Sequence, residues 1–353
     1  MSIQKLPLPY DLETKQVLKK VNTANKALAE LKGVVSSIPN AAILINALVL
    51  QEAKDSSAIE NIITTHDDLY KAELSLEGIK SLEAKEVQNY IAALKHGFDL
   101  ISTHKVLTVN QIQKIQETLE KNNAGLRANP GTTLTNATTG QVVYTPPQNA
   151  QEIQELMTNL ERFINDDDLS DLDPLIKMAI IHHQFESIHP FYDGNGRTGR
   201  IINVLYLVIK DLLELPILYL SRYIIANKAE YYRLLQDVRE TNNWEPWLLY
   251  IITGVENIAN ETIQVVKNIQ QLMSEYKHSI RAQYKKFYSQ DLLNNLFKHP
   301  YTKIEFMEKD LGVSRKTAAN YLNTLANDGF LKKAKLGQAN YYINERLYNI
   351  LLL

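Results

Sequence analysis

The feature that most constrains the fold of this chain is the spacing of its apolar residues, which recur every three or four positions almost throughout. That period matches one face of an α-helix rather than the two-residue alternation of a half-buried strand. The stretch 150–165 is the clearest example, with apolar residues at Ile153, Leu156, Met157, Leu160, Phe163 and Ile164. We therefore predict a mainly α-helical protein, with further helices near 48–64, 228–239 and 245–279.

Two regions depart from this pattern. Residues 131–147, "GTTLTNATTGQVVYTPP", are rich in Thr, Val and Gly and stop at two prolines, which predicts a β-hairpin over 131–145. From about Asp291 the chain reads as helix, glycine-containing turn and second helix, and then as two alternating strands around Gly337. That order predicts a small C-terminal winged helix-turn-helix.

Composition excludes several classes of protein. The 353 residues carry 38 Lys and Arg against 40 Asp and Glu, so the net charge of −2 gives no general attraction to nucleic acid or anionic membrane. Cysteine is absent, which excludes disulfides, thiolate catalysis and cysteine-based zinc sites. The N-terminus lacks the apolar core of a signal peptide, and the most apolar run is too short to span a bilayer. We expect a cytoplasmic protein with no membrane partner.

The stretch "HPFYDGNGRTGR", residues 189–200, concentrates chemistry at the start of a helix. Arg197 and Arg200 oppose the positive end of the helix dipole, which indicates that an anion lies between them. The glycines of "DGNG" allow the backbone N–H groups to form an anion nest, and forked guanidinium groups suit phosphate. Asp193 is an oxygen donor suited to Mg²⁺. A histidine side chain can titrate near neutral pH, so His189 is a candidate general base.

Each of these features alone has a plainer explanation. A single Gly-x-Gly loop is usually a turn, a histidine at a helix end is usually a cap, and an arginine at a helix start often pairs with a neighbouring acid. Their combination within twelve residues favours a di- or triphosphate site.

Residues 189–200 also resemble the signature of Fic-domain proteins at every defined position, and the resemblance extends over residues 1 to about 280. It implies a helical Fic-type core over 106–285, with the hairpin as a substrate-positioning flap. An N-terminal helical region would cover 1–105, and the winged helix would cover 291–353.

The activity implied by this resemblance is transfer of AMP from Mg-ATP, or Mn-ATP, to a Ser, Thr or Tyr hydroxyl of a protein, including the enzyme itself. His189 would deprotonate the hydroxyl and Asp193 would hold the metal. Val142 and Val143 of the flap would align the target, and Tyr231 and Tyr232 would lie near the adenine or else be core residues. The Asn195 side chain would lie near the α-phosphate, and the two arginines would hold the β- and γ-phosphates. The signature positions that would bind ATP are Gly194, Asn195, Gly196, Arg197, Thr198, Gly199 and Arg200. Gly196 favours AMP transfer over the phosphate transfer of the Doc-like branch, which has lysine there.

A second stretch, "DSSAIENIITTHDDLY" from Asp55, resembles the family's inhibitory motif through Ser56, Glu60 and Asn61. Taken alone it is an ordinary solvated helix face. Within a Fic protein it implies that Glu60 pairs with Arg200 and occupies the arginine that should hold the γ-phosphate. The sequence leaves open whether Glu60 is a brake or also positions a water for removal of AMP.

The C-terminal region leaves more than one function open. Residues 291–353 carry nine Lys and Arg against six Asp and Glu, a net of +3. Arg315 and Lys316 on the second helix, and Lys332 and Lys333 on the wing, are candidate contacts for DNA phosphates or for a protein partner. DNA binding is the less favoured of these, and a DNA-binding regulator with the Fic core as nucleotide sensor is the alternative function. A homodimer that stabilises the inhibitory helix is compatible with the sequence.

Overall fold

The computed structural model describes residues 3–38, 41–65, 69, 81–136, 139–336 and 339–352. The predicted wing turn at Gly337 lies outside these residues. The described chain is mainly helical, as predicted. Its helices are α1 (Lys15–Val35), α2 (Ala41–Ile59), α4 (Leu82–Ser102), α5 (Val109–Glu120), α6 (Ala150–Asn165), α7 (Pro174–Ile188), α8 (Asn195–Ile209), α9 (Ser221–Ala226), α10 (Lys228–Thr241), α11 (Trp244–Gln283), α12 (Gln290–Lys298), α13 (Ile304–Leu311), α14 (Arg315–Asn327) and α15 (Glu345–Leu351), with a 3₁₀ turn at Asp167–Leu169.

Helices α7 and α8 form the centre of the N-terminal two thirds of the molecule. Asp173 caps α7 by accepting from the N–H of Leu175, and Pro174 occupies the first helical position, where its missing N–H costs nothing. Every residue of α7 after Pro174 is buried, and α8 is buried at all positions except Gly196. A helix that is apolar nearly all round belongs in a core, so the pair is the scaffold on which the signature loop between them is held.

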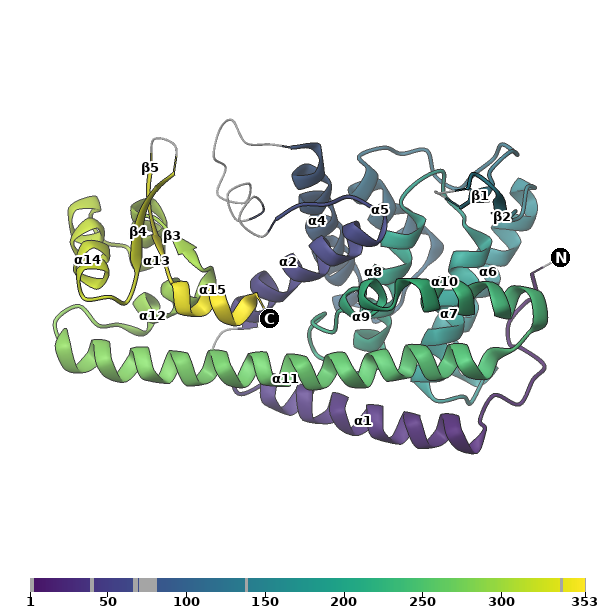
Figure 1. Cartoon of the computed structure of the whole chain (residues 1–353), viewed down its shortest axis with the longest axis horizontal. Coiled ribbons are helices and arrows are strands. Elements are labelled where there is room, and N and C mark those ends of the chain that lie inside the picture. Colours follow the sequence, from purple (N-terminus) through teal and green to yellow (C-terminus); the bar gives the residue numbers. More distant parts are fainter. Residues whose placement is uncertain are drawn as a thin grey trace.

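The 40-residue helix α11 joins the two ends of the molecule. Figure 1 shows it running beneath both the part built on α7 and α8 and the C-terminal part, with α1 lying alongside it. Helix α1 packs there through Val17, Val21, Leu28 and Leu31, all of which are buried. Among the described helices, none is long and apolar enough to cross a membrane.

Helix α2 begins and ends earlier than the predicted 48–64. It ends in a Schellman motif: the N–H of Asn61 bonds to the carbonyl of Ala58, and the N–H of Ile62 bonds to that of Ser57. Asn61 has φ 65°, a left-handed conformation that asparagine tolerates better than most residues. Glu60 is therefore the C-cap of α2 rather than a residue within a longer helix.

The two small sheets occur in the regions predicted for them. In the first, β1 (Leu134–Thr135) pairs antiparallel with β2 (Val142–Tyr144). The second has the order β3-β5-β4, formed by Tyr301–Thr302, Ala339–Ile343 and Lys332–Leu336. Helices α13 and α14 precede the β4–β5 hairpin, and Gly312 ends α13 with φ 64°. This is the element order predicted for the C-terminal region; helices α12 and α15 and strand β3 were not predicted.

Candidate nucleotide and protein-substrate site

The signature residues link the end of α7 to the start of α8. His189 is the left-handed C-cap of α7, with φ 48°, and its N–H bonds to the carbonyl of Phe185. Gly194 is the N-cap of α8, with φ 74°, and it has no side-chain capping bond. The chain therefore reverses within five residues and places His189 beside the free N–H groups at the positive end of α8.

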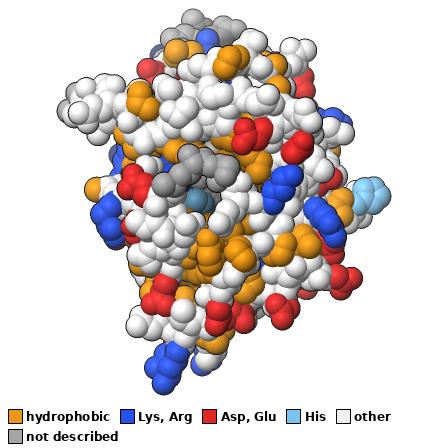
Figure 2. Space-filling model, turned by 90° about the vertical axis from the view of Figure 1, so that its right-hand side faces the viewer, with side chains coloured by type: hydrophobic (Ala, Val, Ile, Leu, Met, Phe, Trp, Pro, Cys, Tyr) orange, Lys and Arg blue, Asp and Glu red, His pale blue; other side chains and the backbone are white. Residues whose placement is uncertain are grey.

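A cavity of about 1060 Å³ opens at this reversal, and the flap and α10 form its other walls. Figure 2 looks onto the end of the molecule that carries the flap; a histidine side chain is visible in the hollow at its centre. Residues of the stretch 189–200 that line the cavity are His189, Tyr192, Asp193, Gly194, Asn195, Gly196 and Arg200. A hollow of this size with polar groups at one end fits a small-molecule site.

The environment of His189 keeps its imidazole neutral. Burial lowers its pKa to about 4, and the positive charges of Arg127 and Arg239 act in the same direction. The Arg127 guanidinium holds this turn by donating to the His189 carbonyl at 2.8 Å and to the Pro147 carbonyl at 3.0 Å. A neutral imidazole can accept a proton at physiological pH, as a general base must.

The Arg200 guanidinium is held by α2. Its Nε donates to Ser56 Oγ at 2.7 Å, and its Nη2 donates to the Ser56 carbonyl at 2.9 Å and to Glu60 Oε1 at 2.8 Å. Burial alone would lower the pKa of Arg200, but Glu60 together with the smaller effects of Tyr231, Tyr90 and Glu186 raises that pKa. The contact between Glu60 and Arg200 is therefore present, as the resemblance implied.

Arg197 has a different environment from the predicted one. It is not among the residues that line the cavity. Its guanidinium is surrounded by carboxylates: Nε lies 2.6 Å from Glu60 Oε2, Nη1 3.1 Å from Glu86 Oε2, and Nη2 3.0 Å from Glu120 Oε1. Glu60 thus bridges both signature arginines. Glu86 and Glu120 carry no motif that would have identified them in the sequence.

Three further residues predicted to bind ATP, Asn195, Thr198 and Gly199, make contacts within the protein instead. The Asn195 Oδ1 atom accepts from the N–H of Phe191, and Asn195 Nδ2 donates to the carbonyl of Phe191, both at 2.8 Å. The side chain therefore holds the loop instead of facing a phosphate. Thr198 is fully buried, and a Cβ on Gly199 would lie 2.8 Å from Glu186 Oε1. On a helix, position 198 lies on the opposite face from position 196. At position 199 a Cβ would also meet Phe185 of α7, at 3.1 Å.

Glu186, which the sequence did not identify, lines the cavity one turn before His189. Its carboxyl is 8% exposed, and Oε1 makes no hydrogen bond within the described residues. Burial raises the pKa of Glu186 to about 7, although Arg200 opposes the shift.

The two tyrosines of α10 have separate surroundings. Tyr231 is 2% exposed; its hydroxyl lies 2.9 Å from His182 Nε2, and its ring packs with Trp247. It is a core residue, which was the alternative to adenine contact, although part of it reaches the cavity wall. Tyr232 is 47% exposed and lines the cavity. Of the two tyrosines, Tyr232 is therefore the one whose ring is open to a ligand.

The flap is anchored beside the cavity. The Tyr144 hydroxyl donates to the Ser187 carbonyl at 2.9 Å, and the Arg239 guanidinium lies 3.9 Å from the centre of the Tyr144 ring. Val142 and Val143 are 58% and 46% exposed, as a surface that pairs with another chain requires.

Asp193 has the chemistry expected of a ligand to the metal of Mg-ATP. Its side chain is 76% exposed at the cavity, and Oδ1 accepts from the N–H of Gly194 at 2.7 Å. Mg²⁺ characteristically takes one or two carboxylates together with substrate phosphates. Within the described ranges, no three His, Asp or Glu side chains gather into a metal site of their own.

The candidate cations of the C-terminal region largely meet groups of their own domain. Arg315 lies 3.6 Å from Glu308, Lys332 lies 2.6 Å from Glu345, and Lys333 donates to Asn323 at 2.8 Å. Lys316 is exposed.

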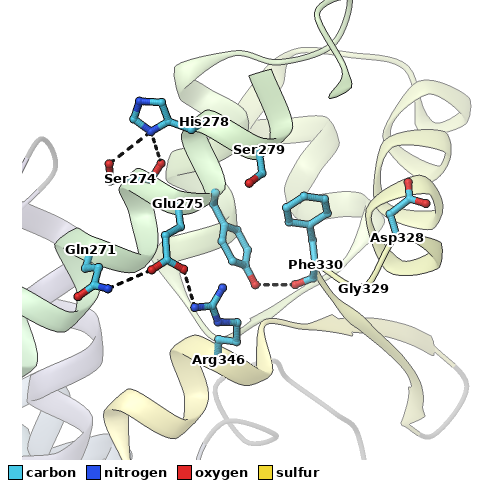
Figure 3. Close-up of a pocket in the computed structure, with 10 residues that line it drawn as sticks. Gln271, Ser274, Glu275, His278, Ser279, Asp328, Gly329, Phe330 and Arg346 are labelled. Carbon is cyan, nitrogen blue, oxygen red and sulfur yellow. Dashed lines mark hydrogen bonds and ion pairs between the residues drawn. The ribbon is translucent and has the colours of Figure 1, made fainter. Parts of the chain in front are cut away.

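A second cavity, of about 650 Å³, lies between α11 and this C-terminal region, and Figure 3 shows the residues around it. Arg346 contacts Glu275 there at 2.6 Å, and the Tyr276 hydroxyl donates to the Phe330 carbonyl at 2.8 Å. Because these polar groups are satisfied by one another, we assign no chemistry to this cavity.

Family comparisons agree with this description along most of the chain. The family models "Fic/DOC family N-terminal" and "Fic/DOC family" match residues 18–99 and 99–207. The model "Protein adenylyltransferase SoFic-like, C-terminal domain" matches residues 272–347. The chain belongs to the Fic family.

Similar proteins and structures were also found. The protein adenylyltransferase fic-1 of Caenorhabditis elegans is 29% identical over 121 residues, which are 34% of this chain and 22% of the relative. The protein adenylyltransferase Fic of Drosophila melanogaster is 39% identical over 56 residues, 16% of this chain and 11% of the relative. This chain thus matches about a fifth or less of the length of these curated relatives.

The fold has solved counterparts. A crystal structure of a Fic family protein from Desulfovibrio desulfuricans aligns with a TM-score of 0.63 and 19% identity, over 97% of this chain and 98% of that one. Fic-1 from C. elegans aligns with a TM-score of 0.56 and 21% identity, over 71% and 74% of the two chains. At these identities the likeness establishes the helical Fic fold.

Proposed function

We propose that this chain is a protein adenylyltransferase that transfers AMP from Mg-ATP to a hydroxyl group of a protein. The hydroxyl oxygen attacks the α-phosphorus, the bond from that phosphorus to the bridging oxygen breaks, and pyrophosphate leaves. The hydroxyl proton passes to His189. The single observation that carries the proposal is that a histidine kept neutral by burial lines the same cavity as Arg200 and the N-terminus of α8.

The triphosphate would lie over the start of α8, where backbone N–H groups and Arg200 supply positive charge. Asp193 would hold the metal that accompanies ATP. The exposed Val142 and Val143 would align the segment of the target that carries a Ser, Thr or Tyr hydroxyl. Positioning and charge stabilisation account for most of phosphoryl-type catalysis, and these groups provide both.

We further propose that Glu60 inhibits the reaction. Its two carboxylate oxygens contact Arg200 and Arg197 at 2.8 and 2.6 Å, so they occupy the groups that the β- and γ-phosphates require. A Cβ on Gly196 would lie 2.6 Å from Glu60 Oε1, which places this carboxylate directly above the phosphate loop. A triphosphate and Glu60 therefore compete for the same positive charge.

The test uses wild type, Glu60→Gly and His189→Ala with Mg-ATP labelled at the α- or the γ-phosphate, followed by protein-bound label. We expect label from α-labelled ATP only, increased by Glu60→Gly and lost in a Glu60→Gly, His189→Ala double variant. Label from γ-labelled ATP would identify a phosphotransferase instead. Equal labelling with and without Glu60 would refute the inhibitory role.

A further inference from the structure

The last two turns of α5 lie directly against the signature loop. Gln116 Nε2 donates to the carbonyl of Asp193 at 3.2 Å. One turn later Glu120 Oε1 lies 3.0 Å from Arg197 Nη2. The same face of α5 therefore contacts the loop backbone at one point and the side chain of a signature arginine at the next.

The contact between Glu120 and the loop is close. A Cβ on Gly194 would lie 2.4 Å from Glu120 Oε1 and 3.0 Å from Glu120 Cδ. Real Cβ atoms do not approach that near, so the loop cannot carry a side chain at position 194 while Glu120 stays in place. A side chain at position 194 would therefore displace the Glu120 carboxylate, and the φ of 74° also favours glycine there.

We propose that Glu120 is a positioning residue for the phosphate loop: it fixes the orientation of Arg197 and supports the loop from the side opposite the ligand. This inference rests on the proposed function. Glu120 and Gln116 do not line the cavity, so they act through Arg197 and the loop and not on the reacting atoms.

The other two carboxylates around Arg197 are less suited to this role. Glu60 is shared with Arg200 and comes from the helix that would release it. The side chain of Glu86 is 31% exposed, compared with 13% for that of Glu120. After Glu60 leaves, Glu120 is the most buried of the remaining partners of Arg197, and its burial raises its pKa to about 7 against the effect of Arg197. Burying an acid at this place costs solvation free energy. The positioning of Arg197 accounts for the presence of an acid despite this cost.

The experiment is done in the full chain with Glu60→Gly, so that inhibition does not mask the effect. Glu120→Ala and Glu120→Gln are compared with Glu117→Ala, an exposed glutamate one turn earlier on the same helix. The measurements are kcat and KM for ATP in AMP transfer, Kd for ATP by calorimetry, and Tm. We expect Glu120→Ala to lower kcat about 10- to 100-fold with a smaller change in KM, because misorientation of Arg197 is felt mainly in the transition state.

Glu120→Gln should recover part of that loss, since it keeps the size and the polar oxygen of the side chain beside Arg197 but not the charge of the ion pair. Glu117→Ala should match its parent. The proposal is overturned if Glu120→Ala lowers Tm but has the same kcat as Glu117→Ala. It is also overturned if the kcat of Glu120→Gln is as low as that of Glu120→Ala. Should the Glu60→Gly parent transfer no AMP, the proposed function fails. The positioning role is then judged from ATP binding, which Glu120→Ala should weaken by less than about tenfold but measurably, while Glu117→Ala leaves it unchanged.

Discussion

Glu60 and Arg200 form an ion pair of 2.8 Å between residues that are 140 positions apart in the chain. Glu60 is the C-cap of α2 and Arg200 lies near the start of α8, so each charge faces the unfavourable end of its own helix dipole. Paired, the two charges compensate each other and both dipoles. A triphosphate can replace the carboxylate only by supplying the same negative charge.

Ser56 should contribute to inhibition by a smaller amount than Glu60. Its Oγ accepts from Arg200 Nε at 2.7 Å, so Ser56→Ala removes one of the three contacts that fix this guanidinium to α2. We expect the rate of AMP transfer to rise about tenfold, which corresponds to about 1.4 kcal/mol, the lower end of the range for a hydrogen bond to a charged group. The matched control is Ser57→Ala, because Ser57 is equally buried but its Oγ makes no hydrogen bond within the described residues. If both variants behave alike, the Ser56 contact does not contribute.

The rate should depend little on pH between 5 and 8 as far as His189 is concerned. Burial lowers its pKa to about 4, so the imidazole is already neutral at pH 5 and becomes protonated only as pH falls through about 4. The measurement is kcat/KM against pH in the Glu60→Gly variant. A decline of tenfold per pH unit that begins near 6.5 would show instead that the base has an ordinary histidine pKa.

Gly194→Ala should abolish activity while Gly140→Ala should not. Both glycines have positive φ, 74° and 69°, so each variant is expected to lose about 1–2 kcal/mol through backbone strain. Only at Gly194 does the new Cβ also meet Glu120, at 2.4 Å, whereas at Gly140 it meets no atom within 4 Å in the described part of the chain. Activity assays combined with thermal unfolding separate the two effects. Equal residual activity in the two variants would contradict the close packing of the loop on α5.

Glu52 should make stability depend on pH. This carboxyl is 1% exposed and accepts from Tyr90 at 2.9 Å and from Ser221 at 2.5 Å. Burial raises its pKa to about 7, so the native state keeps a proton that the unfolded state loses above about 4.5. Glu52 therefore contributes about 3 kcal/mol to the free energy of unfolding below pH 4.5, and this contribution is lost as the pH rises through about 7. Glu52→Gln should remove this dependence in denaturant unfolding at pH 5 and pH 8; an unchanged difference between the two pH values would contradict it.

Duplex DNA should bind weakly at most. Lys332 is paired with Glu345 and Arg315 lies near Glu308, so two of the four candidate cations would have to leave carboxylates to meet phosphates. Filter binding with mixed duplex at low salt measures this directly. Micromolar or tighter affinity that falls steeply with added salt would restore the DNA-binding alternative.

The sequence predicted the elements better than their ends and contacts. Helical spacing and the Thr-rich interruption located the helical body and the flap because both signals are local. The end of α2 was placed too late, since the pattern continues past Ile59 and only the left-handed Asn61 stops it. An asparagine followed by an isoleucine that can close a Schellman motif is the signal that was available.

Within the site, the motif identified some residues that line the cavity but did not predict which groups each of its side chains contacts. His189 and Arg200 line the cavity, but Arg197 turns to carboxylates from α2, α4 and α5. Glu120 and Glu186 belong to ordinary amphipathic or buried helices, and nothing in their neighbours distinguishes them. Their positions follow from how helices pack, which a single sequence does not specify.

Helix α2 contacts more than the site. Packed against α12, it also uses the Gln51 amide to donate to the carbonyl of Leu351 at the end of α15. Residues 51 and 60 are nine positions apart, about 13 Å along one rigid helix. One helix thus carries a contact to the C-terminal region near its middle and a contact to Arg200 at its end. The carboxylate that covers the phosphate loop is therefore supplied by the same element on which the C-terminal region rests.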